Sequence, residues 1–211
     1  MKKFFVLIAA LAASLYVADA QNLKQCLKTA PAELFLPADS LNREKLFNVT
    51  GSIGYSGAQT IFGDSVMISR VNDNFISFDY ASACMEIKKI GGSIIVAKTV
   101  GNRFKESELY FYDASWNLNS SWIFGVKHSD YMPCDEEIRQ NLIVRPDTMS
   151  MEDFESLKKS FDPFMVRVSL SDIEDKITLE PVCPLLFDEE KTRVQSLVRQ
   201  KIFKWTDGKF K

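Results

Sequence analysis

Short runs of alternating apolar and polar residues constrain this chain more than any other feature. In Phe75–Tyr80, apolar or aromatic side chains at 76, 78 and 80 alternate with polar ones at 77 and 79. A period of two places these side chains on opposite faces of a β-strand. Similar runs predict strands at residues 65–71, 85–87, 93–100, 108–113, 121–126, 138–144, 164–171 and 176–180. The chain is therefore expected to be mainly β.

Tight turns separate most of these runs. Asn72-Asp73-Asn74, Gly91-Gly92 and Gly101-Asn102 each favour a reversal of the chain between neighbouring strands. After Tyr80 the alternation changes phase, which predicts a bulge or a bend. About eight to ten strands in one antiparallel meander must hide their edges, and an up-and-down β-barrel does so most simply. A β-sandwich or a lipid-transfer type of α+β fold would give the same succession of strands.

Three helices are expected beside the strands. Ser40 can cap a short N-terminal helix at residues 41–47, and Ser150 with Asp153 resembles a capping box for a helix that ends at Asp162-Pro163. A C-terminal helix is predicted from Asp188 to about Ile202, with acidic residues at its start and basic residues at its end. Its apolar face comprises Val194, Leu197, Val198 and Ile202.

The first twenty residues, MKKFFVLIAALAASLYVADA, have the pattern of a secretory signal peptide. Two lysines precede an apolar run, and Ala18-Asp19-Ala20 is a small-x-small cleavage signal. We expect cleavage after Ala20, leaving residues 21–211 as a single secreted domain. No later segment has the length of a transmembrane helix, so the mature chain is expected to have none.

The charge balance argues against nucleic acid as a partner. The chain has 26 Lys and Arg against 28 Asp and Glu, and loss of Lys2, Lys3 and Asp19 leaves 24 against 27, a net charge of −3. The C-terminal segment Lys191–Lys211 differs, since its seven basic residues and single acid give it a local charge of +6. Such a segment can attract a sulfated glycan or an acidic protein, although solvated charges at a chain end are the commoner case.

Cysteines and sequons fit an extracellular protein. The even count of four, Cys26, Cys84, Cys134 and Cys183, predicts two disulfides in an oxidising compartment, with all three pairings open. Asn48 and Asn119 begin Asn-x-Ser/Thr sequons and are expected to be glycosylated in a eukaryotic source. Without a CxxC motif, we expect no zinc site.

The stretch HSDYMPCDEE, residues 128–137, is the best candidate for chemistry in the sequence. It holds His128, the only histidine, beside Cys134 and four acids. One histidine cannot build a multi-histidine metal centre, and there is no GxSxG motif to supply a serine nucleophile. Adjacent acids such as Asp135 and Glu136 are usually solvated. A hydrolase using two acids has the least support, and we expect no catalytic residue, no metal, no cofactor and no enzyme activity.

Taken together, the signal peptide, the turn at residues 42–47, the meander and the C-terminal helix resemble the layout of lipocalin-type calycins, especially secreted arthropod ones. In that family a Gly-x-Trp signature marks the first strand, and here Gly51-Ser52-Ile53 occupies that place without the Trp. The resemblance implies a small hydrophobic or amine ligand inside a barrel, with these aromatic residues as candidate lining: Phe78, Tyr80, Tyr110, Tyr112, Trp122 and Phe124. A filled core would use the same residues. The alternative is a secreted, glycosylated module that binds a protein or an anionic glycan through its surface or through Lys191–Lys211.

Overall fold

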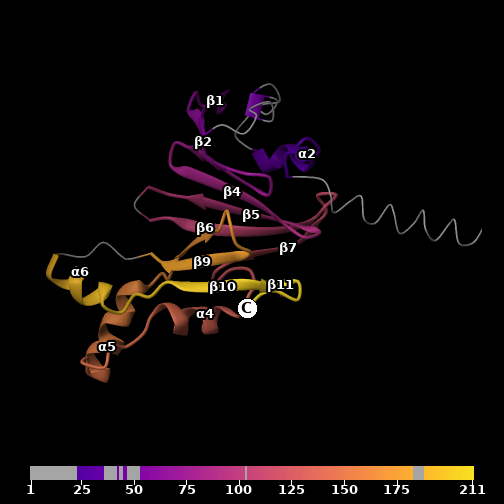
Figure 1. Cartoon of the computed structure of the whole chain (residues 1–211). Helices are drawn as coiled ribbons and strands as arrows, with labels where there is room; N and C mark the ends of the chain where they lie inside the picture. The colour runs from indigo at the N-terminus through magenta and orange to yellow at the C-terminus, as the bar shows by residue number, and fades with distance from the viewer. Residues whose placement is uncertain (1–22, 36–41, 43–44, 47–52, 103, 183–187) are drawn as a thin grey trace, which may run out of the picture.

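Seven consecutive strands form one antiparallel sheet in the computed structural model, which describes residues 23–35, 42, 45–46, 53–102, 104–182 and 188–211. Their order in the sheet is their order in the sequence, so each strand pairs with the next one along the chain (Figure 1). The strands are β1 (Gly54–Gln59), β2 (Ser65–Val71), β3 (Phe75–Tyr80), β4 (Ala83–Ile90), β5 (Ser93–Val100), β6 (Glu106–Asp113) and β7 (Leu118–Ile123). The expected antiparallel meander is confirmed for these seven strands, but the later predicted strands belong to a second sheet.

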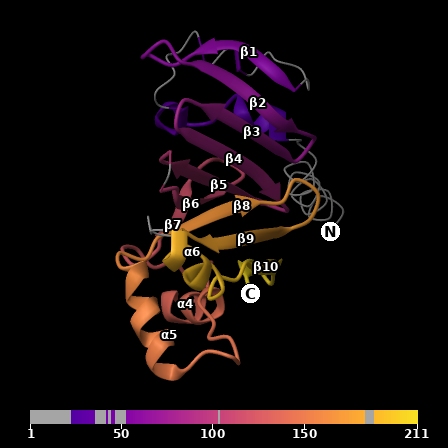
Figure 2. The same cartoon turned by 90° about the vertical axis from the view of Figure 1, so that its left-hand side faces the viewer.

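A second antiparallel sheet has four strands in the order β11-β10-β9-β8. They are β8 (Val166–Leu170), β9 (Lys176–Pro181), β10 (Lys201–Thr206) and β11 (Lys209–Phe210). β8 also contacts β4, β5 and β6 of the first sheet. The second sheet therefore covers part of one face of the first (Figure 2).

Short helices precede the first sheet in the sequence, connect β7 to β8, and connect β9 to β10. They are α2 (Leu23–Leu27), the 3-10 turn η1 (Ala32–Phe35), α4 (Asp135–Leu142), α5 (Met151–Lys158), the 3-10 turn η2 (Lys159–Phe161) and α6 (Asp188–Gln195). α4, α5 and α6 gather near β8, β9 and β10, whereas α2 lies against the first sheet (Figures 1 and 2). No helix in the described ranges is long and apolar enough to cross a bilayer.

The first sheet is buried on both faces by different partners. The face that carries Phe75, Ile95 and Leu109, called here the inner face, packs against the second sheet and α4. The opposite face, called the arm face, carries Phe78 and Ile87 and packs against α2 and η1. A strand pattern with apolar residues at consecutive positions, such as Ile94, Ile95 and Val96, follows from this burial on two sides.

Side chains of the inner face also form hydrogen bonds with the edge of β8 that does not pair with β9. The Val168 N–H donates to Ser107 Oγ (2.9 Å), and the Leu170 N–H donates to Glu86 Oε2 (2.7 Å). Lys88 Nζ donates to the carbonyl oxygens of Ser171 and Glu174, both at 2.7 Å. Side chains of the first sheet thus satisfy backbone groups that an edge strand would otherwise leave unpaired.

The expected closed barrel is wrong. β1 pairs with β2 and β7 with β6, and the two do not pair with each other in the described part of the sheet. After β7 the chain leaves the sheet through α4 and α5 and returns as β8 across the inner face, not beside β1. Within the described residues the first sheet is open and its two faces pack against different partners, so this part of the chain does not form the closed barrel cavity that the lipocalin resemblance implied.

Three local predictions also differ from the structure. Residues 138–144, predicted as a strand, lie largely in α4, where Ile138 and Leu142 share one buried helical face. The C-terminal helix ends at Gln195, because the following segment forms β10 against β9. The phase change after Tyr80 is a two-residue reversal, since Ala81 takes a left-handed φ of 48° and β4 starts at Ala83.

Other local predictions are confirmed. The strands at 65–71, 75–80 and 93–100 have the predicted bounds. Ser150 caps α5 by accepting the Asp153 N–H at 3.1 Å, as a capping box does. The signal peptide predicted at 1–20 lies outside the described residues, as does most of the short helix predicted at 41–47.

Candidate functional site

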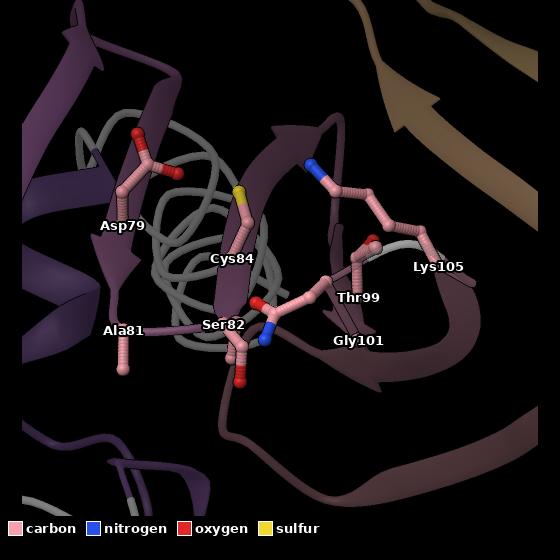
Figure 3. A pocket seen from close by; sticks show the side chains of 9 residues that line it. Asp79, Ala81, Ser82, Cys84, Thr99, Gly101 and Lys105 are labelled. Atoms are coloured by element: carbon pink, nitrogen blue, oxygen red, sulfur yellow. The ribbon is translucent and has the colours of Figure 1, made fainter.

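A pocket of about 380 Å³ opens where two hairpins of the first sheet end. The β3–β4 turn contributes Ala81 and Ser82, and the β5–β6 connection contributes Gly101, Asn102 and Lys105. Alternate hairpins of a meander reverse at the same end of the sheet, so these two turns are neighbours. Asp79, Ala83, Cys84 and Thr99 complete the lining (Figure 3).

The side chains of Asp79, Cys84 and Thr99 form one row across the inner face. Asp79 pairs with Cys84 across β3 and β4, and Cys84 pairs with Thr99 across β4 and β5. Thr99 Oγ1 lies 2.7 Å from Ser107 Oγ, which in turn accepts the Val168 N–H. The row therefore runs from the edge of β8 into the pocket.

Cys84 is a protonated thiol in this setting. Burial, followed by its hydrogen bond with Asp79, raises the pKa of Cys84 to about 12. The Ser77 hydroxyl, 3.7 Å from Sγ, opposes this shift but does not cancel it. A cysteine nucleophile needs a lowered pKa, so Cys84 is suited to packing and hydrogen bonding and not to covalent catalysis.

Lys105 supplies the positive charge of the pocket. Its exposed side chain extends from the β5–β6 connection toward the Cys84 side chain (Figure 3). Asp79 lies beyond Cys84 in the same view and provides a carboxylate. A small site thus offers one cation, one anion, a thiol and a hydroxyl.

Gly101 determines the path of the connection that carries Lys105. Its φ is +118°, and a Cβ at this position would lie 1.8 Å from the Phe104 carbonyl oxygen. Its N–H donates to the Ser82 carbonyl oxygen (2.9 Å), which ties the connection to the β3–β4 turn. Only glycine fits this combination of backbone angle and close approach.

A buried ionic group adjoins the pocket row. Glu86 Oε1 forms an ion pair with Arg70, and Lys88 Nζ lies 3.5 Å from Asp175 Oδ1. Burial raises the pKa of Glu86, an effect that the Leu170 N–H and Arg70 oppose. Burial likewise lowers the pKa of Lys88 against the attraction of Asp175. Because these groups already bind β8 and its following turn, they serve the packing of the two sheets.

The predicted barrel-lining aromatics do not converge on one cavity. Phe78 is buried in the arm-face core, and Tyr80, Tyr110 and Tyr112 pack against that core. Trp122 and Phe124 belong to the inner-face core. The sheet itself separates the two groups, so the prediction that all six line one ligand cavity is wrong.

The cysteines that the structure describes are free thiols. Cys26 is buried in α2, Cys84 borders the pocket and Cys134 is exposed before α4. The expected disulfides are therefore not formed among these three, and Cys183 lies outside the described residues. Asn48 also lies outside them, whereas Asn119 is an exposed residue of β7.

The stretch HSDYMPCDEE is a structural connection. Asp135 Oδ1 accepts the Trp122 Nε1–H (3.1 Å) and Oδ2 accepts the Gly125 N–H (2.8 Å), so this acid ties the start of α4 to the end of β7. His128 lies at the surface, with Nε2 3.7 Å from Asp130 Oδ1. Among the residues that the structure describes, no group of three or more His, Cys, Asp or Glu side chains could hold a metal ion.

The basic C-terminal segment is folded. Phe203 and Phe210 are buried, and Asp207-Gly208, both at positive φ, form the turn between β10 and β11. Arg193 forms an ion pair with Asp153 (2.9 Å), and Lys211 with Asp207 (2.7 Å). Asp207 is already counted in the local charge of +6, so of these two pairs only the one with Asp153 balances part of that charge from outside the segment.

These observations define a mainly β protein of two antiparallel sheets, with a few helices and a small polar pocket at the end of the larger sheet. The chain belongs to the family described as "Protein of unknown function (DUF3256)", whose model matches residues 15–210. A solved structure of a domain of an uncharacterized protein from Porphyromonas gingivalis W83 is similar, with a TM-score of 0.68 at 19% identity over 91% of this chain and 99% of that chain. At this identity the likeness shows the fold alone. No curated protein matches the chain.

Sequence reasoning missed the pocket because its residues belong to no motif. A usable signal was present in the spacing of the turns. Ala81-Ser82 and Gly101-Asn102 are separated by one complete hairpin, which places both at the same end of an antiparallel sheet. The phase change after Tyr80 marked the first of these turns, but an alanine at positive φ is rare enough that a bulge was the more natural interpretation.

Proposed function

We propose that the protein is a secreted binding protein that holds a small zwitterionic ligand in the pocket at Asp79, Cys84 and Lys105. One observation carries the proposal: a carboxylate and an ammonium group line the same small pocket. The amine of such a ligand would bind Asp79, and its anionic group would bind Lys105. This proposal keeps the amine ligand that the lipocalin resemblance implied and moves the ligand from a barrel interior to the end of the sheet.

The neighbouring groups support binding and not turnover. Cys84, with its raised pKa, remains protonated at neutral pH. Thr99 is buried and shares its hydroxyl hydrogen bond with Ser107. A pocket without an activated nucleophile fits a carrier or a sensor of a ligand. The pattern at residues 1–20 supports export to the cell exterior or periplasm.

Calorimetric titration with ω-amino acids of increasing length tests the proposal. Glycine, β-alanine and 4-aminobutyrate carry both charges, whereas butylamine and butyrate carry one each. We expect saturable binding of at least one amino acid and roughly tenfold weaker binding of either single-charge analogue, because each loses one charge-assisted contact. Equal affinity for butylamine or butyrate would refute the zwitterion site.

Two variants locate the ligand. Asp79→Asn and Lys105→Met are each expected to weaken binding of the best amino acid by roughly tenfold. Asp147→Asn and Lys127→Met are matched controls, since both residues are exposed and lie outside the pocket lining. If all four variants bind equally well, the ligand binds elsewhere. If no probe binds, the proposal fails for this class of ligand.

A further inference from the structure

A second hollow, of about 240 Å³, lies between α4 and α5. On α4, Glu136, Arg139, Gln140 and the following Ile143 have the spacing of one helical face. On α5, Phe154 and Lys158 are four residues apart and face the same hollow. We call this hollow the helix groove, and its remaining lining residues are Val144 and Arg145.

The floor of the helix groove is apolar. Ile143 and Phe154 are buried, and Val144 is 38% exposed. The guanidinium carbon of Arg139 lies 4.6 Å from the centre of the Phe164 ring and 5.8 Å from that of Phe124. These two rings hold the Arg139 head at the edge of the groove by cation–π attraction.

Positive charge dominates the rim. The charged residues of the lining are three bases, Arg139, Arg145 and Lys158, and one acid, Glu136. Within the described chain Arg139 and Arg145 form no ion pair, and Lys158 Nζ lies 3.9 Å from Oε1 of the exposed Glu155 and 5.7 Å from the centre of the Phe154 ring. Arg145 Nη1 donates to the Met149 carbonyl oxygen (2.7 Å), which leaves its other donors available. A groove with an apolar floor and a net charge of +2 is complementary to an apolar chain that ends in an anion.

We infer that the helix groove binds an aliphatic carboxylate of short or medium chain length. The charge complementarity of the rim selects a carboxylate, and the apolar floor selects an alkyl chain. The volume lies just below the range of roughly 300–1,000 Å³ typical of pockets for drug-sized ligands, so a single short chain fits better than a complete diacyl lipid. The carboxylate binds Arg139 at the rim, and the chain covers Ile143, Val144 and Phe154. This site is separate from the proposed zwitterion pocket and does not depend on it.

Titration of the purified protein with octanoate, followed by calorimetry, tests this inference. Octanoate is expected to bind saturably, and octan-1-ol and octyltrimethylammonium at least about fivefold more weakly, because neither gains the charge-assisted hydrogen bonds. Butyrate is also expected to bind more weakly, because it covers less of the apolar floor. Octyltrimethylammonium binding as tightly as octanoate would overturn the charge argument.

Two groove variants and one control make the test specific. Arg139→Gln should weaken octanoate binding at least about fivefold. Val144→Glu adds a carboxylate at a partly exposed position and should abolish octanoate binding without disturbing a buried residue. Arg167→Gln, on β8 and away from the groove, should leave it unchanged. Equal binding by all three variants, or no saturable binding by a wild-type protein with a cooperative thermal transition, would overturn the inference.

Discussion

The two faces of the seven-stranded sheet are buried by different physical means. The arm face is covered by α2 and η1, and its core is apolar, with Phe78, Met85 and Ile87 each at most 2% exposed. The inner face combines an apolar centre with polar groups such as Glu86, which accept hydrogen bonds from backbone N–H groups of β8. Every buried side-chain nitrogen or oxygen in the described chain has a hydrogen-bond partner, so these polar groups are satisfied.

This difference between the two faces explains why the polar pocket lies on the inner face. An apolar face can be covered by any segment of suitable hydrophobicity, here the N-terminal arm. A face with fixed donors and acceptors specifies the position of its partner, because each buried group must meet its counterpart. Beyond the reach of β8 the same polar row continues through Thr99 and Cys84 to Asp79, and the pocket opens there.

Truncation on the arm face should have the largest effect on stability. Phe78→Ala removes a ring that is 1% exposed and is expected to lower the free energy of unfolding by about 3–5 kcal/mol, since it leaves a cavity in a core. Chemical denaturation followed by circular dichroism measures this loss. Ile173→Ala is the control, because Ile173 is 86% exposed and its loss should change stability by less than about 0.5 kcal/mol. A loss below about 1 kcal/mol for Phe78→Ala would show that this face is loosely packed.

Removal of the Glu86 carboxylate should be the next most damaging change. Glu86→Ala leaves the Leu170 N–H without its acceptor and removes the closer of the two ion pairs of Arg70, which keeps only its 3.9 Å contact with Asp172. Because Arg70 is partly exposed, we expect a loss of about 2–3 kcal/mol, below the cost of breaking a fully buried pair. Glu86→Gln retains an acceptor for Leu170 and should lose less. Equal losses for both variants would show that the charge, and not the backbone contact, holds β8.

Ser107→Ala tests the second contact with β8 and should have a smaller effect. The change removes the acceptor of the Val168 N–H and the partner of the Thr99 hydroxyl. One buried donor left unpaired costs about 1–2 kcal/mol. Ser115→Ala, at an exposed position, is the matched control. Slower amide exchange at Val168 in Ser107→Ala than in the wild type would contradict the assigned hydrogen bond.

Local patterns predicted the bounds of three strands of the larger sheet, whereas β7 lies at Leu118–Ile123 and not at 121–126, and β1 was not predicted. Ser65–Val71, Phe75–Tyr80 and Ser93–Val100 are confirmed because their alternation and the turns that bound them are encoded within a few residues. The Ser150 cap is likewise local. The closed barrel was wrong because closure depends on which strand lies beside β1, and a meander pattern does not encode that contact.

The wrong predictions concern segments whose structure depends on residues far away in the sequence. The helix predicted to reach about Ile202 ends at Gln195, because pairing with β9 makes Lys201 and Ile202 the start of a strand. Residues 138–144 have a short apolar run that fits either structure, and burial of Ile138 and Leu142 on one side makes it helical. The pocket combines Asp79 with Lys105 from different hairpins, so its composition appears only once the strands are paired.

The smallest expected effect is a dependence of the free energy of unfolding on pH that arises from Glu86 on the inner face. Burial raises the pKa of Glu86 in the folded state, so the folded protein holds this proton at a pH where the unfolded chain has released it. Stability contributed by Glu86 is therefore present below the pKa of the unfolded chain and is lost as the pH rises through the folded pKa. Urea denaturation from about pH 4 to about pH 8 should show the stability of the wild type falling relative to Glu86→Gln, which cannot titrate at this position. A rise of the wild type relative to Glu86→Gln would mean that the attraction of Arg70 outweighs desolvation, and the inner face would then owe its hold on β8 to the ion pair.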